Sequence, residues 1–299
     1  MPPSPPPSPD AERRYRQGLA HAAAAYLIWS ANPLYFALLA GVPAMEITAH
    51  RAWWSLPVLI GLLAASGRLG AALRTILTWP MAGLLLLSSF FIGANWWLFV
   101  HGLETGRTLE MSFGYYIYPL LSVAAGYLLG ERFSRLQALA VALVALAVLW
   151  LMFSTGAVPW LALLLGGSFT IYGLLRKHIA IGALEGLLAE ALVLSAAFGL
   201  WLAWRHAPMH FGATLRQSLL LALAGPMTVA PLAFYAAAAR RIRFSTLGLM
   251  FYIIPTSFFI TAIFIFGEPF DASRAMAFVL IWAALALYSW DTFRGRTAS

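Results

Sequence analysis

The segment RTLEMSFGYYIYP at Arg107–Pro119 has a counterpart later in the chain, RFSTLGLMFYIIP at Arg243–Pro255. Both segments begin with arginine and end in Tyr-x-x-Pro, so that Tyr116 and Pro119 each lie 136 residues before Tyr252 and Pro255. Each segment is followed by an apolar stretch that ends in Gly-Glu. This similarity predicts that the chain is built from two related halves.

The composition is that of a membrane protein. Of the 299 residues, 62% are apolar and 10% are charged, and the mean hydropathy is +0.80. A soluble domain has roughly 45–50% apolar and about 25% charged residues. The 19 Lys and Arg and 11 Asp and Glu residues are too few to cover a water-facing surface. The composition therefore excludes a soluble enzyme and a disordered chain, and it predicts an all-α protein embedded in a lipid bilayer.

Ten apolar stretches are long enough to cross a bilayer, since about 20 apolar residues span the hydrocarbon core as a helix. The first is longer than the ~7–15 residues of a signal-peptide core, so we expect it to be an uncleaved transmembrane helix. Residues 1–17, which are rich in proline, are expected to form a disordered tail, and residues 293–299 a second tail. The ten expected spans are 18–40, 44–65, 79–102, 107–129, 134–153, 157–176, 182–204, 216–239, 244–267 and 272–292.

The basic residues predict the orientation of these helices, because loops rich in Lys and Arg stay in the cytoplasm. Loops on one side of the ten spans contain four arginines, whereas all other basic residues except Arg51 lie on the side of the N-terminus. Both termini are therefore expected in the cytoplasm. With five spans in each half, the second half (157–292) is inverted relative to the first (18–153). Inverted repeats around a central site are typical of secondary transporters.

The chain contains no motif that indicates an enzyme. A Walker A loop requires Gly-Lys-Ser/Thr, but the single lysine, Lys177, lies in Arg-Lys-His. The nucleophile elbow Gly-x-Ser-x-Gly is absent as well. There is no cysteine, which excludes disulfides and thiolate metal sites. We therefore expect no catalytic activity, cofactor or metal, and neither a nucleotide nor a nucleic acid as partner.

Three of the ionisable residues within the expected spans are candidates for function, because a charge there costs several kcal/mol unless it faces a cavity or a partner. Arg51 lies about 10 Å into the second span at ~1.5 Å per residue, and Glu190 lies on the repeat-related span. Both are candidates for a gate, for recognition of substrate charge or for coupling to protons. A buried ion pair between the halves, or an arginine that extends to the membrane surface, would explain the same pattern. His50 is a further proton-carrier candidate, although it points about 100° around the helix from Arg51.

Aromatic and amide side chains near the middle of the spans are candidates for substrate contact. Asn95 needs a partner within the apolar region, either another helix or a ligand. Tryptophan and tyrosine also gather at membrane interfaces, so an aromatic residue alone does not define a cavity. Pro119 and Pro255 are candidate hinges because proline kinks a helix. The predicted cavity residues are Trp29, Asn95, Trp96, Tyr116, Tyr118, Tyr172, Phe251 and Tyr252.

Several segments resemble the RarD-type permeases of the EamA branch of the drug/metabolite transporter superfamily. They include AHRAWWS at Ala49–Ser55, NWWLF at Asn95–Phe99, the first repeat segment, YGLLRK at Tyr172–Lys177 and the region Ser245–Pro269. The resemblance implies an inner-membrane protein of ten helices in two inverted EamA repeats, which moves small metabolites or drugs, usually outward.

This chain departs from the RarD pattern at two positions. The pattern has Asn just before the first repeat proline and Gln just before the second repeat tyrosine, where this chain has Tyr118 and Phe251. If both side chains face the cavity, two amide contacts have been exchanged for aromatic surface. We therefore expect a preference for a more apolar or aromatic solute.

The leading functional hypothesis is an alternating-access exporter of a small amphipathic metabolite, amino-acid-like compound or drug, with the two repeats as rocking halves and protons as a candidate coupling ion. A structural or regulatory membrane subunit is the second hypothesis, and an intramembrane lipid-modifying enzyme the third. A deep cavity between the halves would favour transport, whereas a solid, dry interface would favour the subunit.

Overall fold

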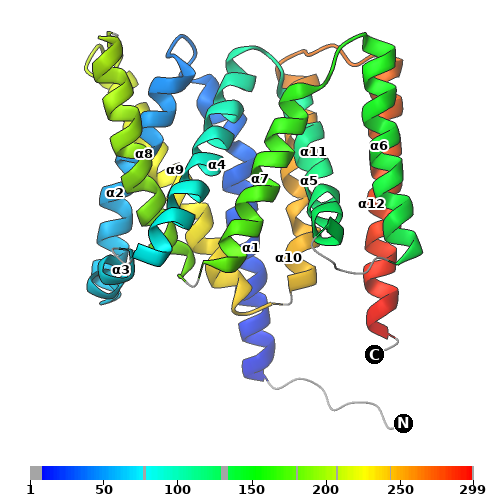
Figure 1. Cartoon of the computed structure of the whole chain (residues 1–299), viewed down its shortest axis with the longest axis horizontal. Coiled ribbons are helices and arrows are strands. Elements are labelled where there is room, and N and C mark those ends of the chain that lie inside the picture. The colour runs from blue at the N-terminus through cyan, green and yellow to red at the C-terminus, as the bar shows by residue number, and fades with distance from the viewer. Residues whose placement is uncertain are drawn as a thin grey trace.

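The computed structural model describes residues 9–76, 79–128, 134–179, 181–206, 208–242 and 244–297. These residues contain helices and no β-strand, so the predicted all-helical class is confirmed (Figure 1). The helices are α1 (Pro9–Ala37), α2 (Ala44–Ala65), α3 (Leu69–Ile76), α4 (Trp79–Glu104), α5 (Thr108–Leu128), α6 (Arg135–Thr155), α7 (Trp160–His178), α8 (Ala183–Arg205), α9 (Leu215–Ala239), α10 (Phe244–Phe251), α11 (Ile253–Ile260), the π-helix η1 (Thr261–Ile265) and α12 (Ala272–Thr297).

Six segments of the described chain are long and apolar enough to cross a membrane. They lie in α4, α6, α8, α9, the run from α10 to η1, and α12. The other four expected spans coincide with α1, α2, α5 and α7, which are helical as well. The chain is thus a multi-pass helical protein, and the number of ten membrane crossings remains a prediction.

The helix boundaries differ from the expected ones at both ends of the chain. The tail predicted for residues 1–17 is helical from Pro9 onward, and α12 continues to Thr297 through most of the expected second tail. Acidic residues in the first turn favour a helix start there, and Glu12 pairs with Arg16 one turn later at 2.9 Å. Residues 1–8, 298 and 299 lie outside the described residues. The short helix α3 was not predicted.

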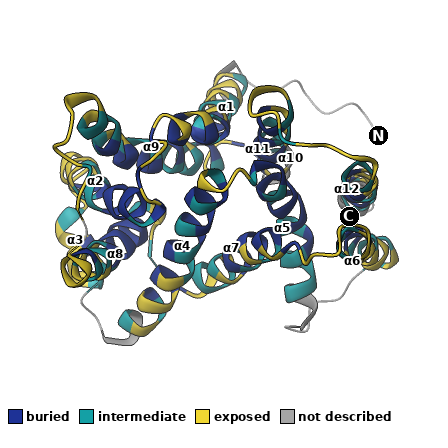
Figure 2. Cartoon of the chain, turned by 90° about the horizontal axis from the view of Figure 1, so that it is seen from above, coloured by how far each residue is buried: buried dark blue, intermediate teal, exposed yellow. Residues whose placement is uncertain are grey.

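The helices of the two sequence halves interlock. Helix α1 packs on α9 of the second half, and its repeat counterpart α7 packs on α4 of the first half. Helices α2 and α8 pack on each other, and α6 packs on α12. In both views α6 and α12 lie side by side at one edge of the bundle (Figures 1 and 2). Each half therefore buries its apolar surface mainly against the other half.

Glycines allow two of these crossings to be unusually close. A Cβ on Gly225 of α9 would overlap the main chain of Trp54 in α2. A Cβ on Gly114 of α5 would lie 2.8 Å from the carbonyl oxygen of Ala162 in α7. Small residues at helix contacts are the usual means of close packing between transmembrane helices.

The two repeat segments adopt different backbones. Helix α5 continues through Pro119, whereas the equivalent stretch is divided into α10 and α11 at Tyr252, three residues before Pro255. Proline is tolerated in the first turn of a helix, where its missing N–H has no partner to lose. The break is followed by the π-helix η1, and π-turns are frequent at functional sites.

Candidate functional site

A cavity of about 800 Å³ lies inside the helix bundle. Its walls come from α1, α2, α4 and α5 of the first half and from α7 to α12 of the second half. The lining residues extend from the middle of the bundle to Arg176 in the last turn of α7, whose end lies on the same side as the start of α1 and the end of α12, toward the bottom of Figure 1. The predicted residues that line it are Trp29, Arg51, Asn95, Trp96, Tyr118, Pro119, Tyr172, Phe251 and Tyr252.

The opposite end of the bundle is closed by hydrogen bonds between the halves. The hydroxyl of Tyr35 in α1 donates to the carbonyl oxygen of Leu220 in α9 at 2.5 Å. The buried Glu46 carboxylate at the start of α2 accepts hydrogen bonds from the backbone N–H groups of His210 and Phe211, at 2.7 and 3.2 Å. It also lies 2.8 Å from Nδ1 of His210. They join the two halves at that end, and none of the residues that form them lines the cavity.

Arg51 projects into the cavity from α2 and is 6% exposed. Its Nε donates to the hydroxyl of Thr228 at 3.2 Å, and its guanidinium lies 4.6 Å from the ring centre of Trp96 and 5.2 Å from that of Phe36. Stacking on an aromatic face stabilises a cation without a counter-charge. Among the described residues, no carboxylate forms an ion pair with Arg51.

Glu190 has other partners than Arg51. Its carboxylate is fully buried and accepts hydrogen bonds from Ser88 at 2.9 Å and from Tyr172 at 3.2 Å. Nη1 of Arg176, at the end of α7, lies 3.8 Å from Oε1. Tyr172 and Arg176 line the cavity, whereas Glu190 lies behind them. The pairing of Arg51 with Glu190, one of the alternatives that the sequence leaves open, therefore does not occur in this conformation.

Asn95 lines the cavity but has its amide directed at a neighbouring helix. Its Nδ2 donates to the carbonyl oxygen of Leu165 at 3.0 Å and to the hydroxyl of Ser168 at 3.1 Å, both in α7. Contact with a helix and contact with substrate were alternatives at the sequence level. The structure provides the first, and the second stays a prediction.

Tyr118 and Phe251, the two positions that depart from the RarD pattern, lie together in the cavity wall. Their ring centres are 5.5 Å apart, and Tyr118 also contacts Phe169 with ring centres 4.8 Å apart. These two positions therefore form one continuous aromatic surface together with Phe169.

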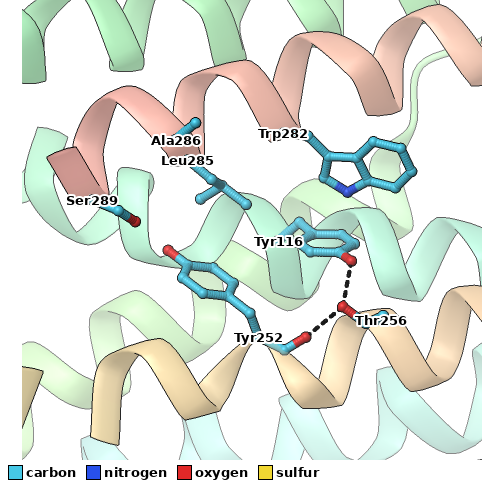
Figure 3. A pocket seen from close by; sticks show the side chains of 7 residues that line it. All are labelled: Tyr116, Tyr252, Thr256, Trp282, Leu285, Ala286 and Ser289. Carbon is cyan, nitrogen blue, oxygen red and sulfur yellow. Dashed lines mark hydrogen bonds between the residues drawn. The ribbon is translucent and has the colours of Figure 1, made fainter. Parts of the chain in front are cut away.

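Besides Glu190, two residues that the sequence predicts for substrate contact or proton transfer lie outside the wall of the large cavity. Tyr116 lines a smaller pocket of about 370 Å³ between α5, α11 and α12, where its hydroxyl lies 2.7 Å from that of Thr256 (Figure 3). His50 is buried beside Glu46 at the closed end, where its ring stacks on Phe211 with centres 5.0 Å apart and accepts a hydrogen bond from Trp54. Neither side chain lines the large cavity.

Several cavity residues were not singled out from the sequence. Asn32, Thr228 and Arg176 also line the cavity. Thr228 is hydrogen-bonded to Arg51, and Asn32 lies one turn of α1 before Phe36, whose ring contacts the Arg51 guanidinium. Asn32 carries the signal that identified Asn95, an amide within an apolar stretch, but it precedes Pro33 and resembles a helix break. Arg176 lies in a basic cluster that orientation alone explains. The described residues contain no group of three or more His, Asp or Glu side chains placed to hold a metal ion.

The sequence profile of the EamA-like transporter family matches residues 16–153. The chain is 41% identical to Protein RarD of Salmonella typhi over 93% of this chain and 96% of that protein. It is 38% identical to an uncharacterized transporter of Vibrio cholerae over 95% of both chains. A solved structure described only as the crystal structure of a protein has a TM-score of 0.61 at 17% identity, covering 91% of this chain and 97% of the other. This last similarity concerns the fold alone.

Proposed function

Because this chain belongs to the RarD-type permeases of the EamA-like transporter family, we propose that it is a secondary transporter that exports a small amphipathic solute. The solute class comprises metabolites, amino-acid-like compounds and drugs. Membership of the family makes the chain a multi-pass membrane transporter; the direction, the solute and the mechanism are part of the proposal. The observation that carries the proposal is a large cavity formed by both halves.

In the proposed topology the chain crosses the inner membrane ten times, in two inverted repeats. Both termini lie in the cytoplasm. Helices coincide with all ten expected spans, and basic residues concentrate on one side of them. The packing supports the inverted repeat, because the contact of α1 with α9 is matched by that of α7 with α4. An even number of crossings also agrees with the start of α1 and the end of α12 lying on one side of the bundle (Figure 1).

In this topology the described conformation is open to the cytoplasm. The cavity extends to the end of the bundle that holds both termini, and the contacts of Tyr35 and Glu46 close the other end. Alternating access requires the closing contacts to break while the cytoplasmic end closes. Since the sequence halves interlock, we propose that the moving groups contain helices from both halves, instead of one half rocking against the other. The break at Tyr252 and the prolines Pro119 and Pro255 are the proposed hinges.

Within the cavity, the proposed substrate contacts are the aromatic wall and Arg51. Tyr118 and Phe251 favour a solute with an apolar or aromatic surface. Glu190 is the proposed coupling group, because it is a buried carboxylate that accepts a hydrogen bond from the cavity-lining Tyr172. A Tyr118→Asn/Phe251→Gln double variant should transport small polar solutes better than the wild type. Equal transport by both proteins would contradict the role of these two rings.

The absence of cysteine makes accessibility a direct test. A Ser122→Cys variant places a thiol on the cavity wall, and Ser154→Cys places one at the exposed far end of α6. A membrane-impermeant maleimide should label the Ser122→Cys variant from the cytoplasmic side and the Ser154→Cys variant only from the outside. Labelling of both variants from the same side would refute the topology.

Flux measurements in proteoliposomes complete the test. The solutes are radiolabelled amino acids, amines, carboxylates and chloramphenicol, and each flux is measured in the presence and in the absence of a pH gradient. The expected result is saturable flux of one class, together with a change in the labelling rate of the Ser122→Cys variant when this solute is added on either side. Gradient-dependent flux that Glu190→Gln makes independent of the gradient would support proton coupling. If nothing is transported and the Ser122→Cys variant is labelled at one rate under all conditions, the protein is a non-transporting subunit.

A further inference from the structure

The cavity wall carries an uncompensated positive charge. Arg51 uses one of its five N–H donors, at Nε, for Thr228. The hydrogen bonds of the described residues leave both Nη atoms without an acceptor, although the side chain is buried and lines the cavity. Trp96 and Phe36 contact the guanidinium with their ring faces, which carry no formal charge. A buried guanidinium in this state is complementary to an oxyanion, which it can bind with two parallel hydrogen bonds.

A second polar side chain without a partner faces the same cavity from a different helix. Asn32 in α1 is 7% exposed and lines the cavity, and its Oδ1 has no hydrogen-bond partner among the described residues. Buried amides normally have partners because desolvation without a hydrogen bond is costly. The amide can present either its oxygen or its NH₂ group by rotation about the last side-chain bond. It can therefore add a donor to a bound oxyanion.

The remaining charges on the wall do not offset Arg51. Arg176, the other arginine of the cavity, lies 3.8 Å from the Glu190 carboxylate, which neutralises it. No Asp or Glu among the described residues lines the cavity. In a low-dielectric interior an unscreened cation favours an anionic ligand strongly and disfavours a cationic one.

The rest of the wall is suited to a flat apolar body. Aromatic rings from several helices line the same cavity as Arg51, including Trp29, Tyr115, Phe169 and Tyr172. The volume of about 800 Å³ is in the range of small-molecule sites. We propose that the cavity selects an aromatic or similarly flat organic anion, whose carboxylate binds Arg51 and Asn32 while its ring contacts the aromatic wall. The inference rests on the proposed transport function, but it concerns binding and is tested separately.

The test compares three ligands that share a phenylalkyl body and end in an anionic, a neutral or a cationic group: 3-phenylpropanoate, 3-phenylpropanamide and 3-phenylpropylamine. Their dissociation constants are measured by calorimetry on the purified full-length protein in detergent at one pH. The carboxylate is expected to bind at least tenfold more tightly than the amide, with the amine weakest. Arg51→Gln should remove this tenfold preference, and Arg51→Lys should retain part of it. Asn32→Ala should weaken the carboxylate about threefold or more and leave the amide unchanged.

Arg107→Gln is the matched control. Its guanidinium also lies 4.6 Å from a tryptophan ring centre, that of Trp160, but Arg107 is paired with Glu110 and does not line the cavity. This variant should keep the wild-type preference. Melting temperatures of all variants identify a folding defect, and the charge-retaining lysine variant keeps the test valid if Arg51→Gln does not fold.

The inference is overturned if the amide or the amine binds the wild type as tightly as the carboxylate, if none of the three binds, or if Arg51→Gln keeps the preference. Flux of radiolabelled 3-phenylpropanoate in proteoliposomes separates the inference from the transport proposal. Carboxylate-selective binding without flux of any solute would refute transport and leave the site intact. Saturable flux of neutral or cationic solutes alone would support transport and overturn the anion site.

Discussion

Two arginines line the cavity, the buried Arg51 and the partly exposed Arg176, and they differ in one respect that determines their effect on stability. Arg176 has a carboxylate partner in Glu190, and Arg51 has none among the described residues. Replacing each in turn by methionine removes the charge and keeps a long flexible side chain. We predict that Arg51→Met leaves the stability close to that of the wild type or raises it, whereas Arg176→Met lowers it.

The magnitudes follow from the contacts. Arg51→Met loses a hydrogen bond from a charged donor, about 1.5–3 kcal/mol, and a cation–π contact of up to about 2 kcal/mol. Thr228 is not left without a partner, because its hydroxyl also donates to the carbonyl oxygen of Ala224 at 2.8 Å. Against these losses stands the desolvation of a buried ion, several kcal/mol. The net change in unfolding free energy is expected within about 1 kcal/mol of zero, or stabilising.

Arg176→Met has no such gain, because it leaves Glu190 buried with only Ser88 and Tyr172 as donors. Removal of one partner of a buried ion pair costs about 3–5 kcal/mol. The N–O distance of 3.8 Å and the two remaining donors place the expected loss toward the lower part of this range. The two variants should therefore differ by about 2 kcal/mol or more, which corresponds to at least about 4 °C in melting temperature.

Intrinsic fluorescence of the 12 tryptophans reports the melting temperature of the purified protein directly. A second substitution, Glu190→Gln, should recover much of the loss in the Arg176→Met background and little in the Arg51→Met background. If Arg51→Met melts as low as Arg176→Met, Arg51 has a counter-charge in the folded protein. The argument for an anionic ligand would then lose its premise.

Three further predictions address packing and closure. Gly114→Ala should destabilise the protein by about 1–3 kcal/mol through overpacking at the crossing of α5 and α7, whereas Gly167→Ala, in open space on α7, should not; equal melting temperatures would show that this crossing can relax. Glu46→Ala should increase labelling of a cavity cysteine from the closed end several-fold, and Glu185→Ala, at the opposite end of the same helix pair, should not; unchanged rates would exclude Glu46 as a closing contact. Asn95→Leu should cost about 1–2 kcal/mol through the two lost hydrogen bonds to α7, and a stability loss below measurement error in thermal unfolding would refute this role.

The sequence could predict the composition of the cavity because polar and aromatic residues within apolar spans are rare and costly. It could not decide which face of each helix the cavity occupies. Tyr116 and Tyr118 are two residues apart and therefore about 200° apart around α5, so only one of them can face a given space. The structure assigns Tyr118 to the large cavity and Tyr116 to the smaller pocket.

The sequence also could not identify which charged side chains of different helices pair with each other. Glu190 and Arg51 are the two charges deepest in their spans, and repeat symmetry places their helices side by side. The pairing with Arg176 depends on the packing of α4 against both α7 and α8, which determines the depth at which the end of α7 meets Glu190. Repeat symmetry likewise predicts equal backbones for the two Tyr-x-x-Pro segments. In the structure one segment is continuous and the other is broken, and the shared sequence pattern does not contain this difference.

The repeat-related glutamates that begin α2 and α8 relate this asymmetry to alternating access. Glu46 accepts hydrogen bonds from two backbone N–H groups and contacts His210, and it is 2% exposed. Glu185 has a single partner, the half-exposed Arg68, and its buried Oε2 has none among the described residues. The end held by Glu46 is closed, and the cavity extends toward the end held by Glu185.

If the halves exchange roles during transport, the bonds that Glu46 loses must be replaced by bonds gained at Glu185. The unused oxygen of Glu185 supplies the acceptor that such an exchange needs. Transport at a useful rate requires the two conformations to differ by no more than a few kcal/mol, because the minor state must be populated. Matched glutamates at opposite ends of the pair α2 and α8 keep the free-energy difference between the two conformations small. The hydrogen bonds lost when one end opens are offset by those formed when the other end closes. A substitution at either glutamate should therefore shift the distribution between the two conformations, and the two substitutions should shift it in opposite directions.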